Sequence, residues 1–210
     1  MMNNMTFAER LPRKPFPWLV LGGLITAVFF LLYLAPEEAT LKSGIRAVYI
    51  HVALTWTGMV GFVLAGVLGL VVMVTANKAS ASWLQTLGWV AFGFYLAGVA
   101  MSAVASKVNW GGVFWQEPRM KTALNGLALA AIILIVIMWM PQIRLQGLLQ
   151  AIIPLSITWM TYRTPLVLHP GNPIFSSEAT GIQATFIGMF LLFAAIAAWI
   201  IWQFTSAGKP

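Results

Sequence analysis

The few charged residues of this chain divide it into long stretches that carry no charge at all. Uncharged runs extend over 18–35, 47–77, 79–106, 122–143, 145–162 and 179–208. A membrane-spanning helix needs about 20 predominantly apolar residues, so each run has room for one such helix. We therefore predict an all-α integral membrane protein, a bundle of six transmembrane helices near 17–36, 48–76, 83–106, 121–141, 146–163 and 179–204.

The composition excludes the main alternatives to a membrane protein. Charged residues make up only 8% of the chain, whereas a soluble domain carries roughly a quarter. The absence of cysteine excludes disulfides, zinc–thiolate sites and a cysteine nucleophile. The net charge of +7 comes from basic residues scattered singly between apolar runs, so we expect the partner to be a lipid bilayer and not nucleic acid. No linker or repeat divides the chain, and residues 1–210 are expected to form a single six-span membrane domain.

Small residues indicate that the helices pack closely against one another. Gly61, Ala65 and Gly69 are four apart in the second predicted helix, and Gly93 begins the same spacing in the third. Small residues at this spacing let helix backbones approach each other in lipid. Pro154 lies in the middle of the fifth and shortest predicted span, where we expect a kink.

The distribution of lysine and arginine predicts the orientation in the membrane. Six basic residues fall on each side of the six predicted spans, but Arg10, Arg13 and Lys14 cluster before the first span, which usually dominates topology. We therefore expect both termini in the cytoplasm of a bacterial cell, with the first span retained in its cytoplasmic (inner) membrane. The longer connections, 37–46, 107–120 and 164–178, are then expected outside, and the function with them.

The two histidines of the chain suggest a site for a metal-containing ligand on this outer face. His51 is expected at the outer end of the second helix and His169 in the last outer loop, with the aromatic segment 110–119 between them. Haem iron takes two axial imidazoles, and the porphyrin faces stack on aromatic rings. Ordinary explanations exist for the same residues. Trp110 and Trp115 could belong to an interfacial aromatic belt, and Glu117 could cap the fourth helix.

These residues resemble the cytochrome c assembly family, in particular its six-span haem exporter (CcmC-like) branch. The segment Ile45-Arg-Ala-Val-Tyr-Ile-His-Val52 resembles the family's first conserved histidine region. Trp110-Gly-Gly-Val-Phe-Trp-Gln-Glu-Pro-Arg119 resembles a degenerate form of its tryptophan-rich segment, with Glu117 where the family has Asp and Gln116 where it has a second Trp. His169 lies before the last span, as the family's second histidine does.

The resemblance implies a protein that handles haem b during cytochrome c maturation and is not an enzyme. It implies that haem is held on the outer face and passed to a membrane-anchored haem chaperone, beside the ABC transporter subunits of the same pathway. His51 and His169 would be the axial ligands of the haem iron. The implied haem-binding residues around them are Trp110, Phe114, Trp115, Glu117 and Arg119, the last of which would meet a propionate, with Lys121 or Arg163 as further candidates.

Three other functions remain open from the residues alone. A haem-b redox subunit would usually place histidine pairs deep within two helices. A repurposed or decayed accessory subunit of a membrane complex would agree with the degenerate tryptophan segment. A solute transporter would carry ionisable residues within its spans, where this chain offers only Asn125, Gln150 and Gln183 as polar candidates.

Overall fold

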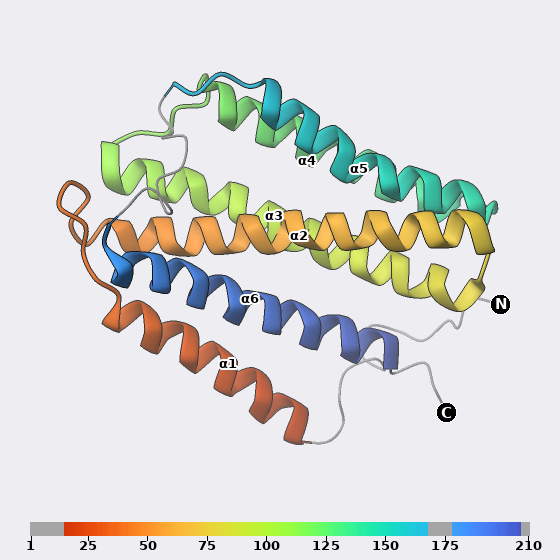
Figure 1. The fold of residues 1–210 in the computed structure, drawn as a ribbon, viewed down its shortest axis with the longest axis horizontal. Helices are drawn as coiled ribbons and strands as arrows, with labels where there is room; N and C mark the ends of the chain where they lie inside the picture. Colours follow the sequence, from red (N-terminus) through yellow and green to blue (C-terminus); the bar gives the residue numbers. More distant parts are fainter. Residues whose placement is uncertain (1–14, 168–177, 207–210) are drawn as a thin grey trace.

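The protein folds into a bundle of long helices in the computed structural model, which describes residues 15–167 and 178–206 (Figure 1). The described residues form six helices: α1 (Pro15–Leu34), α2 (Ile45–Thr75), α3 (Lys78–Trp110), α4 (Pro118–Trp139), α5 (Ile143–Arg163) and α6 (Thr180–Ser206). Each predicted span overlaps one of these helices, and the prediction of an all-α fold is confirmed for the described residues.

Five of the six described helices are long and apolar enough to cross a membrane. These are α1, α2, α3, α4 and α6, whose most apolar windows have mean hydropathies between 1.7 and 2.4. Helix α5 does not meet the same standard. It carries Arg144, Gln146, Gln150 and Pro154 within 21 residues. The chain is therefore suited to a multi-pass membrane protein, and the fifth predicted span is the one that composition does not support.

Helix α3 is longer than predicted, which changes the position of the aromatic segment. It begins at Lys78, because the side chain of Asn77 caps it by accepting a hydrogen bond from the Ser80 amide at 3.1 Å. It continues past Lys107 to Trp110. The prediction that Trp110 lies in a loop is wrong. The prediction ended the span before Lys107, but a lysine near the end of a span can extend its charge to the interface without ending the helix.

The connections differ in length at the two ends of the bundle. Segments 35–44 and 111–117 lie at one end, here called the long-loop end, where α5 also finishes and α6 begins (Figure 1). Segments 76–77 and 140–142 lie at the opposite, short-loop end. The indole N–H of Trp199 donates a hydrogen bond to the Pro17 carbonyl at 3.1 Å, which joins the start of α1 to α6.

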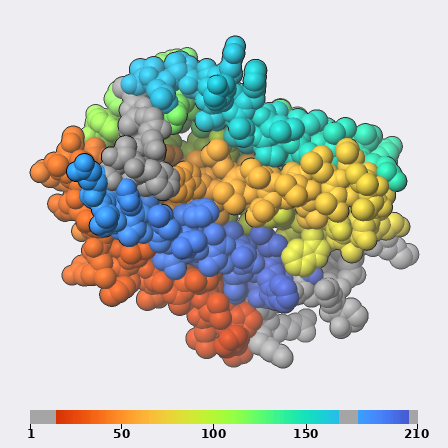
Figure 2. Space-filling model, in the orientation of Figure 1, coloured from red at the N-terminus to blue at the C-terminus, as the bar shows by residue number. Residues whose placement is uncertain are grey.

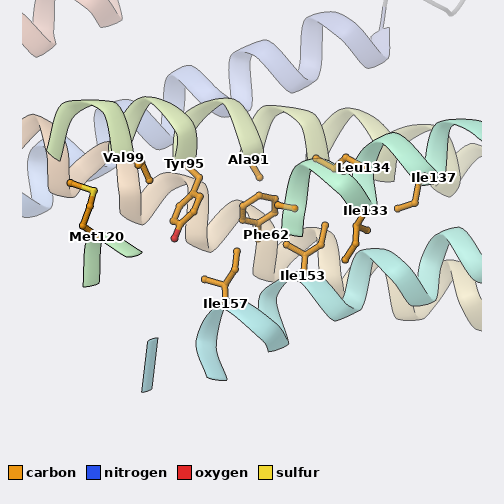
Figure 3. Packing of buried hydrophobic residues seen from close by; sticks show 11 residues of the cluster. Phe62, Ala91, Tyr95, Val99, Met120, Ile133, Leu134, Ile137, Ile153 and Ile157 are labelled. Atoms are coloured by element: carbon orange, nitrogen blue, oxygen red, sulfur yellow. The ribbon is translucent and has the colours of Figure 1, made fainter. Parts of the chain in front are cut away.

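Helix α2 is the central helix, and it packs against α3, α5 and α6. The larger apolar cluster joins α2 to α3, α4 and α5, with Phe62 and Tyr95 in edge-to-face contact at 5.9 Å (Figure 3). A second cluster joins α2 to α1 and α6 around Tyr49 and Phe186, whose ring centroids lie 4.6 Å apart. Helix α1 packs mainly on α6 and forms the outermost layer of the bundle.

The predicted contacts of small residues are confirmed for α2. Gly61 faces Ala91 of α3 so closely that an added Cβ would lie 2.8 Å from the Ala91 Cβ. Gly69 faces Gly147 of α5, with room for no side chain on either residue. Both glycines therefore allow close approach of helix backbones.

The same prediction is wrong for α3, where a different glycine makes the contact. No atom lies within 4 Å of the position that a Cβ on Gly93 would occupy, so this residue packs against nothing within that radius. Gly98 instead faces Thr55 of α2, and an added Cβ would lie 2.5 Å from the Thr55 hydroxyl oxygen. The four-residue spacing indicated that a packing face exists but not which glycine lies on it.

Candidate functional site

His51 is held by a hydrogen bond that crosses from α2 to α3. The side chain is half-buried in the second turn of α2, and its Nδ1 atom lies 2.8 Å from the backbone carbonyl oxygen of Gly98. A carbonyl oxygen can only accept, so the neutral imidazole carries its proton on Nδ1 and its lone pair on Nε2. Nε2 is therefore the ring atom with the chemistry to bind a metal.

Thr55 is the second polar neighbour of the His51 ring. Its hydroxyl oxygen lies 3.4 Å from Nδ1, but the hydroxyl donates its proton to the His51 backbone carbonyl at 2.8 Å. The Gly98 carbonyl, which no sequence motif indicated, therefore determines the tautomer. A backbone acceptor of this kind also fixes the orientation of a metal-binding histidine.

His51 lies near the long-loop end of the bundle. The hydroxyl of Tyr49, two residues earlier, donates to the Pro36 carbonyl at 3.1 Å. Pro36 follows the last residue of α1 by two positions. Along the bundle axis, His51 thus lies close to the level at which α1 ends. It is about one and a half helical turns from the start of α2.

Trp110 does not lie beside His51. It is the last residue of α3, twelve residues beyond Gly98, which corresponds to about 18 Å along the helix axis. The following Gly111 ends the helix with a left-handed conformation at φ 78°. The aromatic side chains of the segment are largely uncovered by the described residues, with exposed fractions of 58% for Trp110, 43% for Phe114 and 56% for Trp115.

The chain after Trp110 turns back toward the depth of His51. The hydroxyl of Ser106 donates to the Gly112 carbonyl at 2.7 Å. The hydroxyl of Ser102 lies 3.8 Å from the sulfur of Met120, in the first turn of α4. Ser102 is one turn from Gly98, so the start of α4 lies closer to the depth of His51 than Trp110 does.

Glu117 caps α4, as one of the two sequence interpretations predicted. One carboxylate oxygen accepts a hydrogen bond from the Met120 amide at 2.7 Å, and Pro118 occupies the first helical position. The side chain is only 6% exposed.

Two arginines at the long-loop end carry buried N–H groups without a hydrogen-bond acceptor among the described residues. These groups are Nε of Arg119, in the first turn of α4, and Nε of Arg46, in the first turn of α2. Sequence reasoning selected Arg119 and missed Arg46, although Arg46 lies within the histidine segment. A buried guanidinium N–H is a strong donor for a carboxylate or phosphate group.

The remaining candidates are less well placed or lie elsewhere. His169 falls outside the described residues. Lys121 and Arg163 line a separate groove between α4 and α5. Within the described ranges, histidine and glutamate side chains do not gather in groups of three or more that could hold a metal ion.

An apolar cavity lies on the face shown in Figure 2, in the hollow between α5 and α2. It has a volume of about 400 Å³ and is lined by α2, α5 and α6, including Trp56, Pro154 and Phe190. His51 is not among its lining residues. No sequence pattern indicated this cavity, apart from the aromatic side chain of Trp56 in α2.

Residues 15–167 and 178–206 thus form an all-helical fold, with five helices able to cross a membrane and a histidine of fixed tautomer near one end. The chain matches no protein-family model and no curated protein.

Proposed function

We propose that this protein handles haem during cytochrome c maturation, binding haem b at the long-loop end and passing it to a membrane-anchored haem chaperone beside ABC transporter subunits. The observation that carries the proposal is the hydrogen bond from His51 Nδ1 to the Gly98 carbonyl, because it places the ring proton on Nδ1 and makes Nε2 the nitrogen with the lone pair that an iron ligand needs. When bound, haem supplies an iron that coordinates imidazole, and the protein's part is binding and delivery, without catalysis.

The residues present fit this ligand in three respects. His51 has the tautomer that an axial ligand needs, and His169 would be the second ligand. Phe114 and Trp115, with Trp110 further out, offer aromatic surface that the described residues leave uncovered. The unpartnered Nε groups of Arg119 and Arg46 would meet propionates, with Glu117 holding the start of α4 in place beside them.

We propose further that α5 crosses the membrane, so that the chain has six spans in a bacterial cytoplasmic membrane with both termini in the cytoplasm. The polar residues of α5 are turned inward: Gln146 and Gln150 are buried, and Pro154 packs on Gly66 of α2. Polar side chains within a span are tolerated when they face the bundle interior. Arg144 and Arg163 lie at the two ends of the helix, where an interface would accommodate them.

The visible absorption spectrum of the detergent-purified protein tests the haem proposal. The wild type should show a Soret band and, on reduction, resolved α and β bands of six-coordinate, low-spin haem. His51→Ala should shift the Soret band toward a five-coordinate or water-ligated form, and added imidazole should restore the original spectrum. Thr86→Ala, near the short-loop end, is the matched control and should leave the spectrum unchanged.

Two outcomes would contradict the proposal. A His51→Ala spectrum identical to that of the wild type would remove His51 as a ligand. A wild-type protein that binds no haem, even after haem is added, would instead favour the repurposed accessory subunit. That second function is favoured by one observation, the distance of about 18 Å along α3 that separates Trp110 from the partner of His51.

A further inference from the structure

A groove with basic, amide and aromatic lining residues lies between the first turns of α4 and the last turns of α5, apart from the histidine site. Its volume is about 460 Å³, and its lining includes Lys121 and Asn125 from α4 and Trp159, Arg163 and Thr164 from the end of α5. Gln116 and Pro118, near the start of α4, also line it. The groove therefore combines two cations, amide groups and an indole in one concave surface.

The charged side chains among the described lining residues of the groove are all positive. Lys121 and Arg163 both line it, and no carboxylate is among its described lining residues. Glu117, the nearest acid in the sequence, directs an oxygen to the Met120 amide at the cap of α4. The guanidinium of Arg163 lies over the ring of Trp159, with its carbon 5.4 Å from the ring centroid. An anion that entered here would meet two cations, one of them already positioned by an aromatic ring.

One hydrogen bond joins the two sides of the groove. The hydroxyl oxygens of Thr122 and Thr164 lie 2.6 Å apart, and both residues line the groove. Thr164 donates its own proton to the Met160 carbonyl at 2.7 Å, so Thr122 is the donor between the two threonines. A groove held in this way is preorganised, which lowers the entropic cost of binding.

The surroundings of the groove are those of a membrane interface. Trp159 is 62% exposed and Tyr162 is 83% exposed, and such aromatic side chains favour the level of lipid headgroups. Toward the middle of the bundle, the same sides of the two helices expose Ile132 of α4 and Leu155 of α5. The groove with its two cations thus continues into apolar surface of the kind that acyl chains cover.

We infer that this groove binds the phosphate group of an anionic phospholipid, with Lys121 and Arg163 on the phosphate oxygens and the acyl chains along Leu155 and Ile132. Phosphate accepts bidentate hydrogen bonds from arginine and the charge of a lysine ammonium. Asn125 and Gln116 supply further donors for a headgroup hydroxyl. The inference does not depend on haem binding.

Native mass spectrometry of the full-length protein, titrated with phosphatidylglycerol in detergent, tests this inference. We expect one tightly bound phosphatidylglycerol and at least fivefold weaker binding of phosphatidylcholine, whose choline offsets the phosphate charge. The double variant Lys121→Gln/Arg163→Gln should weaken the tight phosphatidylglycerol site about tenfold. The matched control is Lys42→Gln/Lys107→Gln, which removes two exposed cations that lie at the same end of the bundle but outside the groove. This control should bind phosphatidylglycerol as tightly as the wild type.

Four results would overturn the inference. Equal loss of phosphatidylglycerol in both double variants would indicate diffuse attraction to surface charge. Equal affinity for the two lipids would remove the charge argument. Displacement of the lipid by millimolar inorganic phosphate would indicate a site for the free ion. If Lys121→Gln/Arg163→Gln lost haem but still bound phosphatidylglycerol like the wild type, the two cations would belong to the haem site.

Discussion

His51 of α2 donates a hydrogen bond to the carbonyl of Gly98 on α3 at the point where Gly98 also lets the two backbones approach each other. The Nδ1–O distance is 2.8 Å, and a Cβ on Gly98 would lie 2.5 Å from the Thr55 hydroxyl oxygen and 2.7 Å from the Thr55 nitrogen. The orientation of the imidazole and the packing of the helices therefore depend on the same residue.

Replacing Gly98 by alanine should test this double role. The added methyl group has to displace the backbone at Thr55, and such overpacking typically costs about 1–3 kcal/mol of unfolding free energy. Gly93→Ala is the matched control on the same helix, since its Cβ would meet no atom within 4 Å. Glycine in a helix is less favourable than alanine by about 1 kcal/mol, so the control should be neutral or stabilising. Thermal unfolding in detergent measures both. Equal Tm values for the two variants would contradict the close approach of α2 and α3.

The cap of α4 gives a second prediction. Glu117→Ala removes the acceptor of the Met120 amide, and loss of a helix cap typically costs about 1 kcal/mol. Glu117→Asp keeps a carboxylate at a position where aspartate is a favoured cap, so it should recover most of that stability. Denaturant titration of the three proteins measures the difference. If aspartate failed to restore stability, the cap would not be the main role of Glu117.

The sequence predicted the helices better than it predicted the site, and the reason is physical. Long apolar runs determine where helices lie, because each must bury its backbone polar groups internally. The contacts between helices depend on rotation about each axis, which composition does not specify. The spacing of small residues correctly indicated Gly61 and Gly69. Because rotation is not specified, the same spacing indicated Gly93 in α3, where Gly98 makes the contact. The acceptor for His51 is a backbone carbonyl, and any residue type could have supplied it.

The connection between α1 and α2 should depend on pH through Glu38. Its carboxylate accepts hydrogen bonds from the Leu41 amide at 2.7 Å and the Thr40 amide at 2.9 Å. The bond from Leu41 is the largest cause that lowers the pKa of Glu38 below its ordinary value of 4.5. A lowered pKa means that the turn is stabilised above pH 4.5 and loses this support as the pH falls through the lower value. Hydrogen exchange of the two amides should be faster in Glu38→Gln than in the wild type at pH 6. The two proteins should converge at low pH, and a difference that persisted there would contradict the assignment.

The aromatic surface gives a prediction that rests on the proposed function. Replacing Trp110 and Trp115 together by alanine should lower haem occupancy, since each aromatic contact typically contributes about 1 kcal/mol beyond the area it buries. The double variant Trp139→Ala/Trp202→Ala removes two exposed indoles near the short-loop end and serves as the control. Haem content per protein, measured by absorbance, compares them. Equal haem content in the two double variants would favour an interfacial role for Trp110 and Trp115.

The last prediction decides whether α5 crosses the membrane. Because the chain has no cysteine, single-cysteine variants report accessibility without background. Gln142→Cys and Val167→Cys lie before and after α5. Ala79→Cys and Lys107→Cys lie in the first and last turns of α3, which is apolar enough to cross. With six spans and a cytoplasmic N-terminus, a membrane-impermeant maleimide added to spheroplasts should label positions 107 and 167. Positions 79 and 142 should react only after permeabilisation. Labelling of 142 and 167 from the same side, with 79 and 107 on opposite sides, would show that α5 does not span. Reversal at all four positions would keep six spans and overturn the orientation, because the basic cluster before α1 would then not determine which side is cytoplasmic.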